Sequence, residues 1–308
     1  MSEMRDTMKA VLLLLLGLLV ATPAYPQAQP ALAWSQAFPS LWHIKGDPIK
    51  GDLGEVYLLG AVHVLPPNLH WRSPVIGRAI SRSDVFAFEV PQDEAALTQL
   101  NGLIQAQGFL PAGQTLRAQL HPAAHSDYDA ALAASGLSPA SVEHERPWLA
   151  GLQLMFAQIA KLKFSPGDGV DSILMAQAAT THKQMRYLET IAEQFALLAP
   201  DDRDLELQEF EAGLKDLRDV GAELGPLVHA WSTGNQIELD KLINGDLDEF
   251  PEARKQLLDD RNKRWAPKIQ AMLKEKHVFF ITVGAGHLTG PVGVPALLRK
   301  AGYKVDGP

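Results

Sequence analysis

Two short segments of this chain carry the same arrangement of glycine, alanine and histidine. They read Gly60-Ala61-Val62-His63 and Gly284-Ala285-Gly286-His287, and each stands between an apolar run and a loop that contains proline. One such segment arises often by chance, and a lone histidine is usually structural, but two copies in the same context favour a shared site. Imidazole groups transfer protons near neutral pH and bind divalent metal ions. We therefore predict that His63 and His287 serve one polar site.

Two glutamates stand where they could join these histidines. Glu89 and Glu189 each end a short run that is predicted to be a strand. A carboxylate on a strand with apolar faces needs a cation, a metal ion or several hydrogen-bond donors as its partner. The sequence leaves Glu89 open as a site residue or as a salt-bridge partner of an arginine such as Arg261. It leaves Glu193 open as a site residue or as a solvated or capping residue of a helix.

The composition and the missing motifs exclude several other kinds of chemistry. The chain has no His-Glu-x-x-His, Gly-x-Ser-x-Gly or P-loop motif, and no cysteine that could act as a nucleophile or bind zinc. Its net charge is -8 and it has no basic run, so we expect no binding to nucleic acid.

Strands must hold the histidine loops, and the hydropathy pattern predicts them. Residues 41–44 and 55–59 predict a hairpin, and residues 84–90, 185–188 and 278–283 predict further strands. Residues 84–90 are apolar on both faces, which is typical of a strand inside a β-α-β unit. Glycine after a strand lets the chain turn sharply, so each histidine would lie at the carboxyl edge, where open α/β sheets bind ligands. We expect an α/β fold, in an α+β variant, with two pseudo-repeated halves flanked by helices.

Helices should account for most of the remaining chain. Residues 93–162 predict a helical insertion that caps the sheet, and residues 201–276 are almost wholly helical in pattern. Breaks in the second stretch are expected near three glycines, Gly221, Gly225 and Gly234. No linker divides residues 41–308, so we expect a single domain there.

The first residues are typical of a cleavable export signal. Positive charge precedes an apolar run over residues 10–21, which is short for a membrane span, and small residues follow it. We predict a signal peptide over residues 1–24, a mobile segment over residues 25–40 and a periplasmic or secreted protein without a stable membrane anchor.

Taken together, an ordered set of short blocks resembles the TraB/GumN family. The two histidine segments look like its paired Gly-x-x-His signatures, and residues 84–90 look like its strand that ends in glutamate. Three further blocks resemble the remaining motifs of the family. These blocks are Gly169-Val170-Asp171, residues 188–194, which include Glu193 and Gln194, and residues 261–265, which include Asn262. Each block is weak alone, but the ordered set is specific and spans residues 42–305, nearly all of the expected mature chain.

The resemblance implies a fold and an activity. The family is related to the Tiki metalloproteases and more distantly to erythromycin-esterase-like and ChaN-like folds, which implies an α/β core with two sheets. It also implies hydrolysis of peptide bonds assisted by a metal ion. Carried over by position, His63, Glu89 and His287 would form the metal or acid/base cluster, with Glu189 and Arg261 nearby. Asp171, Glu193, Gln194 and Asn262 would be secondary site residues.

Such a cluster suits particular ions and steps. Two neutral imidazoles and a carboxylate suit zinc, manganese or cobalt, which would lower the pKa of a bound water and polarise a carbonyl group. Glu189 would then act as the general base. Metal-free acid/base catalysis by His63 and Glu89 stays open, as does a non-catalytic binding or assembly factor, linked through the GumN name to polysaccharide export. The chain lacks the cysteines and the C-terminal anchor of the Tiki proteins, so the substrate, the metal and the oligomeric state stay open.

Overall fold

The computed structural model describes residues 36–47, 49, 51–248 and 251–308. The predicted signal peptide, residues 1–24, lies outside the described residues, as does most of the predicted mobile segment. The last part of that segment is held in place, since Ala37 is fully buried and its N–H donates to the carbonyl of His70. Within the described residues, no helix is both long enough and apolar enough to span a membrane.

One mixed sheet of six strands forms the centre of the described residues, in the order β4-β3-β5-β2-β1-β6. Its strands are β1 (Leu41–Lys45), β2 (Glu55–Ala61), β3 (Val85–Phe88), β4 (Gln184–Tyr187), β5 (Val278–Gly284) and β6 (Val305–Asp306). Strands β4, β3, β5 and β2 run parallel, while β1 pairs antiparallel with β2 and β6. This confirms the predicted hairpin and the α/β class.

The number of sheets differs from the expectation. The strands that carry the two histidine loops, β2 and β5, pair directly with each other from Glu55 opposite Val278 to Ala61 opposite Gly284. Because the two strands share one ladder of hydrogen bonds, the two halves contribute to a single sheet and do not build two sheets.

The central strands are apolar on both sides because each side of the sheet has its own core. In β3, Phe86 and Phe88 pack into one cluster of buried residues, while Val85 and Ala87 pack into the other. Successive side chains of a strand point to opposite faces, so this division follows directly from the sequence. The buried strand leaves Glu89 at its carboxyl end, beside the neighbouring strand β5.

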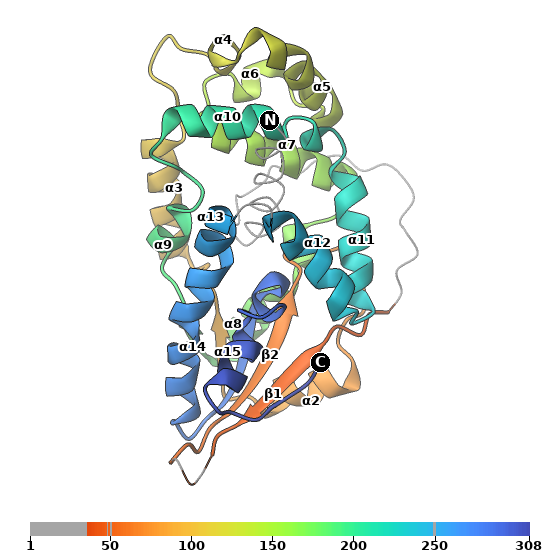
Figure 1. Ribbon diagram of the computed structural model, residues 1–308, viewed down its shortest axis with the longest axis vertical. Coiled ribbons are helices and arrows are strands. Elements are labelled where there is room, and N and C mark those ends of the chain that lie inside the picture. The colour runs from red at the N-terminus through yellow and green to blue at the C-terminus, as the bar shows by residue number, and fades with distance from the viewer. Residues whose placement is uncertain (1–35, 48, 50, 249–250) are drawn as a thin grey trace.

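Helices surround the sheet and extend beyond one end of it, as Figure 1 shows. The helices before β4 are α2 (Pro74–Arg82), α3 (Glu94–Gln107), α4 (Leu116–Gln119), η2 (Pro122–Ala124), α5 (His125–Ser135), α6 (Pro139–Val142), α7 (Pro147–Lys161), η3 (Pro166–Asp168) and α8 (Val170–Thr180). Those after it are α9 (Ile191–Phe195), α10 (Arg203–Gly213), η4 (Asp216–Arg218), α11 (Val220–Ser232), α12 (Gln236–Asp248), α13 (Pro251–Arg254), the π-helical segment η5 (Lys255–Asp259), α14 (Asp260–Leu273), η6 (Ala285–Leu288) and α15 (Val294–Lys300). The predicted insertion, residues 93–162, is helical, and its helices α4 to α7 lie far from β1 (Figure 1).

One of the three predicted breaks in the later helical stretch is wrong. The chain is not helical at Asp219 and α11 begins at Val220, next to Gly221, and Gly234 follows the end of α11 with a φ of 68°. Gly225, however, lies within α11. Glycine within a helix costs about 1 kcal/mol relative to alanine. In α11 the burial of large apolar residues such as Trp231 outweighs that cost.

Candidate functional site

The two histidines and Glu89 meet at the end of β5. A Cβ atom added to Gly284 would lie 3.1 Å from His63 Nε2, 3.3 Å from Glu89 Oε1 and 3.6 Å from His287 Cδ2. His63 and Glu89 lie just beyond the ends of β2 and β3, and His287 lies in η6, which follows β5. These three strands are neighbours in the sheet. The structure therefore brings both histidine loops to one site, at the carboxyl edge of parallel strands, and glycine leaves the room that this site needs.

His63 is held by the start of α8. Its Nδ1 lies 3.0 Å from Asp171 Oδ1, and both residues are buried. A Cβ at Gly169 would lie 2.3 Å from the His63 carbonyl oxygen, so glycine lets α8 approach the loop closely enough for this contact. Burial lowers the pKa of His63, but the charges of Asp171 and Glu89 outweigh it, and the pKa is raised above its ordinary value.

The pKa of His287 is shifted in the opposite direction. Its Nδ1 lies 2.7 Å from Asn262 Oδ1, and Asn262 Nδ2 donates to the Val292 carbonyl at 3.1 Å, which fixes the orientation of the amide. Nδ1 therefore carries the hydrogen, and Nε2 accepts from Arg261 Nη1 at 3.0 Å. Burial and the Arg261 charge hold the pKa of His287 well below its ordinary value, so this ring is neutral.

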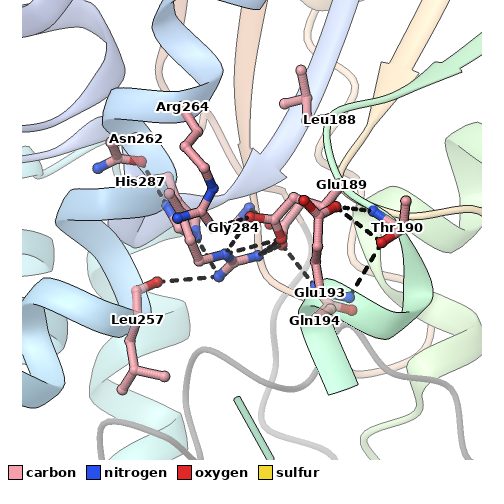
Figure 2. A network of polar contacts seen from close by, with 12 residues as sticks. Leu188, Glu189, Thr190, Glu193, Gln194, Leu257, Asn262, Arg264, Gly284 and His287 are labelled. Carbon is pink, nitrogen blue, oxygen red and sulfur yellow. Dashed lines mark hydrogen bonds and ion pairs between the residues drawn. The ribbon is translucent and has the colours of Figure 1, made fainter. Parts of the chain in front are cut away.

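Arg261 donates to three side chains of a buried polar network, Glu89, Glu189 and His287. Figure 2 shows this part of the molecule from close by, with Glu189, Gln194 and His287 labelled. The guanidinium donates to Glu89 Oε2 at 2.6 Å and to Glu189 Oε2 through Nη2 at 2.9 Å, and its side chain is fully buried. Nη1 also donates to the Leu257 carbonyl at 3.2 Å, and the ring of Trp265 lies 4.8 Å from the guanidinium carbon. A fully buried cation thus balances two buried carboxylates.

The two glutamates, Glu89 and Glu189, have different hydrogen-bond partners. Glu89 Oε1 accepts the N–H of Gly284 at 2.6 Å, and its Oε2 accepts from Gln194 at 3.1 Å as well as from Arg261. Both oxygens of Glu189 accept from Arg261, and Oε1 also accepts from Arg264 at 3.3 Å. The structure therefore contains the Glu89–Arg261 salt bridge that the sequence left open. Both oxygens of Glu189 accept hydrogen bonds from arginine side chains, and this arrangement does not suit the general-base role expected of Glu189.

Glu193 is a helix-capping residue. Its carboxylate accepts the Thr190 N–H at 2.8 Å, and its own N–H donates to Thr190 Oγ1 at 3.2 Å, which makes a capping box at the start of α9. The hydrogen bonds that the N–H and the hydroxyl group of Thr190 donate to this carboxylate lower the pKa of Glu193. Glu193 thus stabilises the short helix that presents Gln194 to Glu89, and it does not join the cluster around Gly284.

A small cavity lies beside His63. It has a volume of about 10 Å³, and its lining includes His63, Glu89, Asp171, Gln194 and Thr282. Five buried polar atoms of these residues have no hydrogen-bond partner among the described residues: His63 Nδ1 and Nε2, Asp171 Oδ1, Gln194 Oε1 and Thr282 Oγ1. His63 Nδ1 and Asp171 Oδ1 still lie within ion-pair distance of each other. A volume on the order of 10–15 Å³ with two to four polar partners can hold one water molecule.

Three residues of the site had no role assigned from the sequence, although two of them, Arg264 and Trp265, belong to the block at residues 261–265. Thr282 interrupts the apolar run of β5 and is buried, so a lone polar residue near the end of a central strand was the available signal. Trp265 packs on the His287 ring at 4.3 Å between centroids, and Arg264 binds Glu189. Helical spacing from Arg261 could have indicated Trp265, because residues four apart on a helix are neighbours.

The donor types around Gly284 suit a divalent metal ion, but their placement does not. In the part of the chain that the structure describes, no three His, Asp or Glu side chains are grouped to hold an ion. Arg261 contacts both His287 Nε2 and Glu89 Oε2, so its guanidinium takes the position between two of the predicted ligands. The predicted zinc, manganese or cobalt ion does not fit these side chains as they stand, and Arg261 supplies the positive charge.

Known proteins resemble this chain over most of its length. It is 23% identical to an uncharacterized protein of Treponema pallidum over 82% of this chain and 79% of that protein. It is 24% identical to a zebrafish (Danio rerio) protein named Metalloprotease TIKI1, over 86% of this chain and 62% of that protein. The uncharacterized protein YbaP of Escherichia coli is 28% identical over 53% of this chain and 60% of its own. No solved structure gives a significant match.

The family model of the TraB/PrgY/gumN family matches residues 40–307 of this chain. The match includes both histidine loops, the strand that ends at Glu89 and the helix that carries Arg261. This protein therefore belongs to the TraB/PrgY/gumN family.

Proposed function

We propose that this protein is a hydrolase of peptide bonds that acts in the periplasm or outside the cell. The observation that carries the proposal is the water-sized cavity beside His63, where an unpartnered ring nitrogen lies next to Glu89 and near a buried arginine. A hydrolase needs a positioned water, a base that takes its proton and a positive charge near the carbonyl oxygen. The similarity to a protein named as a metalloprotease supports the peptide as substrate.

His63 is the proposed general base. Asp171 Oδ1 lies 3.0 Å from Nδ1, so its charge favours the tautomer with the hydrogen on Nδ1 and leaves the lone pair of Nε2 without a partner beside the cavity. A carboxylate that fixes the tautomer of a histidine in this way also stabilises the imidazolium formed when the ring takes a proton. Glu89 is less suited to be the base, because both of its oxygens already accept hydrogen bonds.

The reaction then follows in two steps. The water oxygen bonds to the peptide carbonyl carbon while its proton passes to His63 Nε2, and the carbonyl oxygen takes up negative charge. The field of Arg261 stabilises that oxyanion. His63 next returns the proton to the leaving nitrogen as the C–N bond breaks, which restores the neutral ring.

A metal-dependent hydrolase is the second candidate. It is favoured by the name of the zebrafish relative and by the Nε2 lone pairs that both histidines direct into the site. The ligands would be His63, Glu89 and His287, and binding would have to displace Arg261 from Glu89 and His287. A metal ion there would supply a polarised carbonyl group and an acidified water.

A non-catalytic binding or assembly factor, linked to polysaccharide export, is the third candidate. The paired network around Arg261 favours it, because buried ion pairs also occur in purely structural cores.

One experiment separates the three candidates. The purified protein is incubated with a peptide library, once with a chelator and once with added manganese, cobalt or zinc, and cleavage is followed by mass spectrometry. Cleavage that survives the chelator and is lost in His63→Gln supports the proposed function. Cleavage only with added metal supports the second candidate, and no cleavage under any condition supports the third. Bound metal is measured in the same samples.

The location has its own test. The protein is expressed in a bacterial host, the cells are fractionated and the N-terminus of the recovered protein is sequenced. A periplasmic protein that begins between residues 25 and 29 supports export, whereas an intact N-terminus in the membrane fraction would contradict it.

A further inference from the structure

A second, larger pocket lies beside the site and has no role in the chemistry proposed above. Its volume is about 320 Å³, which falls in the range of small-molecule and peptide side-chain sites. Helices α7, α10 and α13 and the segment after α9 contribute to its wall. The apolar part of the lining includes Trp148, Leu152, Leu197, Leu205, Phe210 and Leu257.

The pocket and the site share two pieces of chain. Leu257 lines the pocket, and its carbonyl oxygen accepts from Arg261 Nη1 at 3.2 Å. Leu197 also lines the pocket, just after α9, whose Gln194 donates to Glu89 at 3.1 Å. A ligand in the pocket would therefore contact the segments that hold Arg261 and Gln194, two partners of Glu89.

The polar part of the lining is acidic, and one acid in it has no cation. Glu206 is paired, since Arg146 donates to it at 2.6 Å and Arg203 lies 3.5 Å away. Glu209 is three residues further along α10 and partly buried, and no hydrogen bond or ion pair joins it to the residues that the structure describes. Burial and the charges of Glu206 and Asp202 raise the pKa of Glu209, as expected for a carboxylate that lacks a partner.

We propose that this pocket binds a large apolar side chain and an adjacent positive charge of a peptide, with Glu209 as the countercharge. The apolar wall removes the side chain from water, and a ligand cation supplies the partner that Glu209 lacks. As a description of substrate preference this rests on the proposed function, but the binding itself can be tested without catalysis. The substrate class is thus a peptide with leucine or phenylalanine next to lysine or arginine.

The test uses peptides that differ only in charge. Two acetylated and amidated hexapeptides contain a single Leu-Lys or Leu-Gln step in a Gly-Ser background, and their binding is measured by calorimetry with the His63→Gln protein, which does not cleave them. We expect the Leu-Lys peptide to bind roughly fivefold more tightly, since a partly buried ion pair contributes on the order of 1 kcal/mol. A third peptide with a free N-terminus and Leu-Gln shows whether an amino terminus supplies the cation equally well.

Two further variants locate the effect. Glu209→Gln should remove the preference for Leu-Lys while keeping the fold, because it relieves repulsion with Glu206 and Asp202. Asp204→Asn is the matched control, since it removes one charge from the same helix at an exposed position outside the lining, and it should leave the preference unchanged. Equal binding of both peptides, or a preference that survives Glu209→Gln, overturns the proposal.

The experiment can disprove the pocket proposal without disproving the proposed hydrolase function, and the reverse also holds. Binding that depends on Glu209 without any cleavage by the unmodified protein would leave the pocket standing and the hydrolase disproved. Cleavage without any preference between the two peptides would leave the hydrolase standing and the pocket proposal disproved.

Discussion

Asp171 Oδ1 lies 3.0 Å from His63 Nδ1, and Asn262 Oδ1 lies 2.7 Å from His287 Nδ1. The two histidines thus meet the same kind of oxygen with the same ring atom, but only Asp171 carries a charge. This difference raises the pKa of His63, while burial and Arg261 lower that of His287. Titratable groups whose pKa values are pushed apart at one site are typical of acid/base pairs.

The first prediction concerns the charge of Asp171. A base must be unprotonated, so activity should rise with pH through the raised pKa of His63. Asp171→Asn removes the charge that raises this pKa, and the acid limb of the pH–rate profile should move to lower pH. Turnover should fall by about 10²–10⁴-fold, the usual contribution of a well-oriented general base. Proton NMR of the His63 ring in both proteins checks the shift directly, and an unchanged titration would show that Asp171 does not govern it.

The second prediction concerns stability at Arg261. Arg261→Met leaves Glu89 and Glu189 buried without their cation, and the free energy of unfolding should fall by about 3–5 kcal/mol. The triple variant Arg261→Met, Glu89→Gln, Glu189→Gln removes the charges together and should regain part of that loss. Urea denaturation of the three proteins measures both values. A triple variant no more stable than Arg261→Met would mean that packing, and not charge, explains the loss.

The third prediction concerns the room at Gly284. Gly284→Ala places a methyl group 3.1 Å from His63 Nε2 and 3.3 Å from Glu89 Oε1, closer than ordinary contacts. We expect at least a tenfold loss of activity, because displacement of a catalytic group by about 1 Å can cost 10²-fold. Gly77→Ala is the matched control, since a Cβ there meets nothing within 4 Å and α2 should become more stable. Activity assays and thermal unfolding of both variants provide the check.

The fourth prediction concerns acid stability. The pKa of His287 lies well below 6.5 in the folded protein, so below about pH 6.5 the unfolded chain binds a proton that the folded chain does not. His287 therefore contributes stability that is present above pH 6.5 and is lost as the pH falls, by up to about 1.4 kcal/mol per pH unit. His287→Gln should flatten the decline in unfolding free energy between pH 6.5 and 5. The same slope in both proteins would place the acid sensitivity elsewhere.

Hydropathy was sufficient to predict most of the fold. Apolar runs over residues 55–59 and 278–283 indicated strands that the structure contains, and the repeated loops indicated that both ends face one site. The order of the strands could not be read in this way, because hydropathy does not say which strand pairs with which. The direct pairing of β2 with β5 therefore had no signal, and two sheets were expected where one exists.

The sequence predicted which residues belong to the site better than it predicted what each of them does. Residue types showed that Glu89 needed a partner, but a guanidinium and a metal ion satisfy a carboxylate equally well. Only the position of Arg261 decides between them for the side chains as placed. Thr282 gave little signal, because threonine is common in strands whatever it contacts.

The two histidine loops show how one residue type can take two tasks within one site. The residues that meet the two Nδ1 atoms come from different parts of the chain, because Asp171 follows His63 on α8 whereas Asn262 precedes His287 on α14. The carboxylate suits the first ring to exchange protons in the proposed reaction, and the amide suits the second to serve as a fixed neutral acceptor for Arg261. The task of each imidazole is thus set by a helix distant from it in the sequence, and not by the loop that carries it.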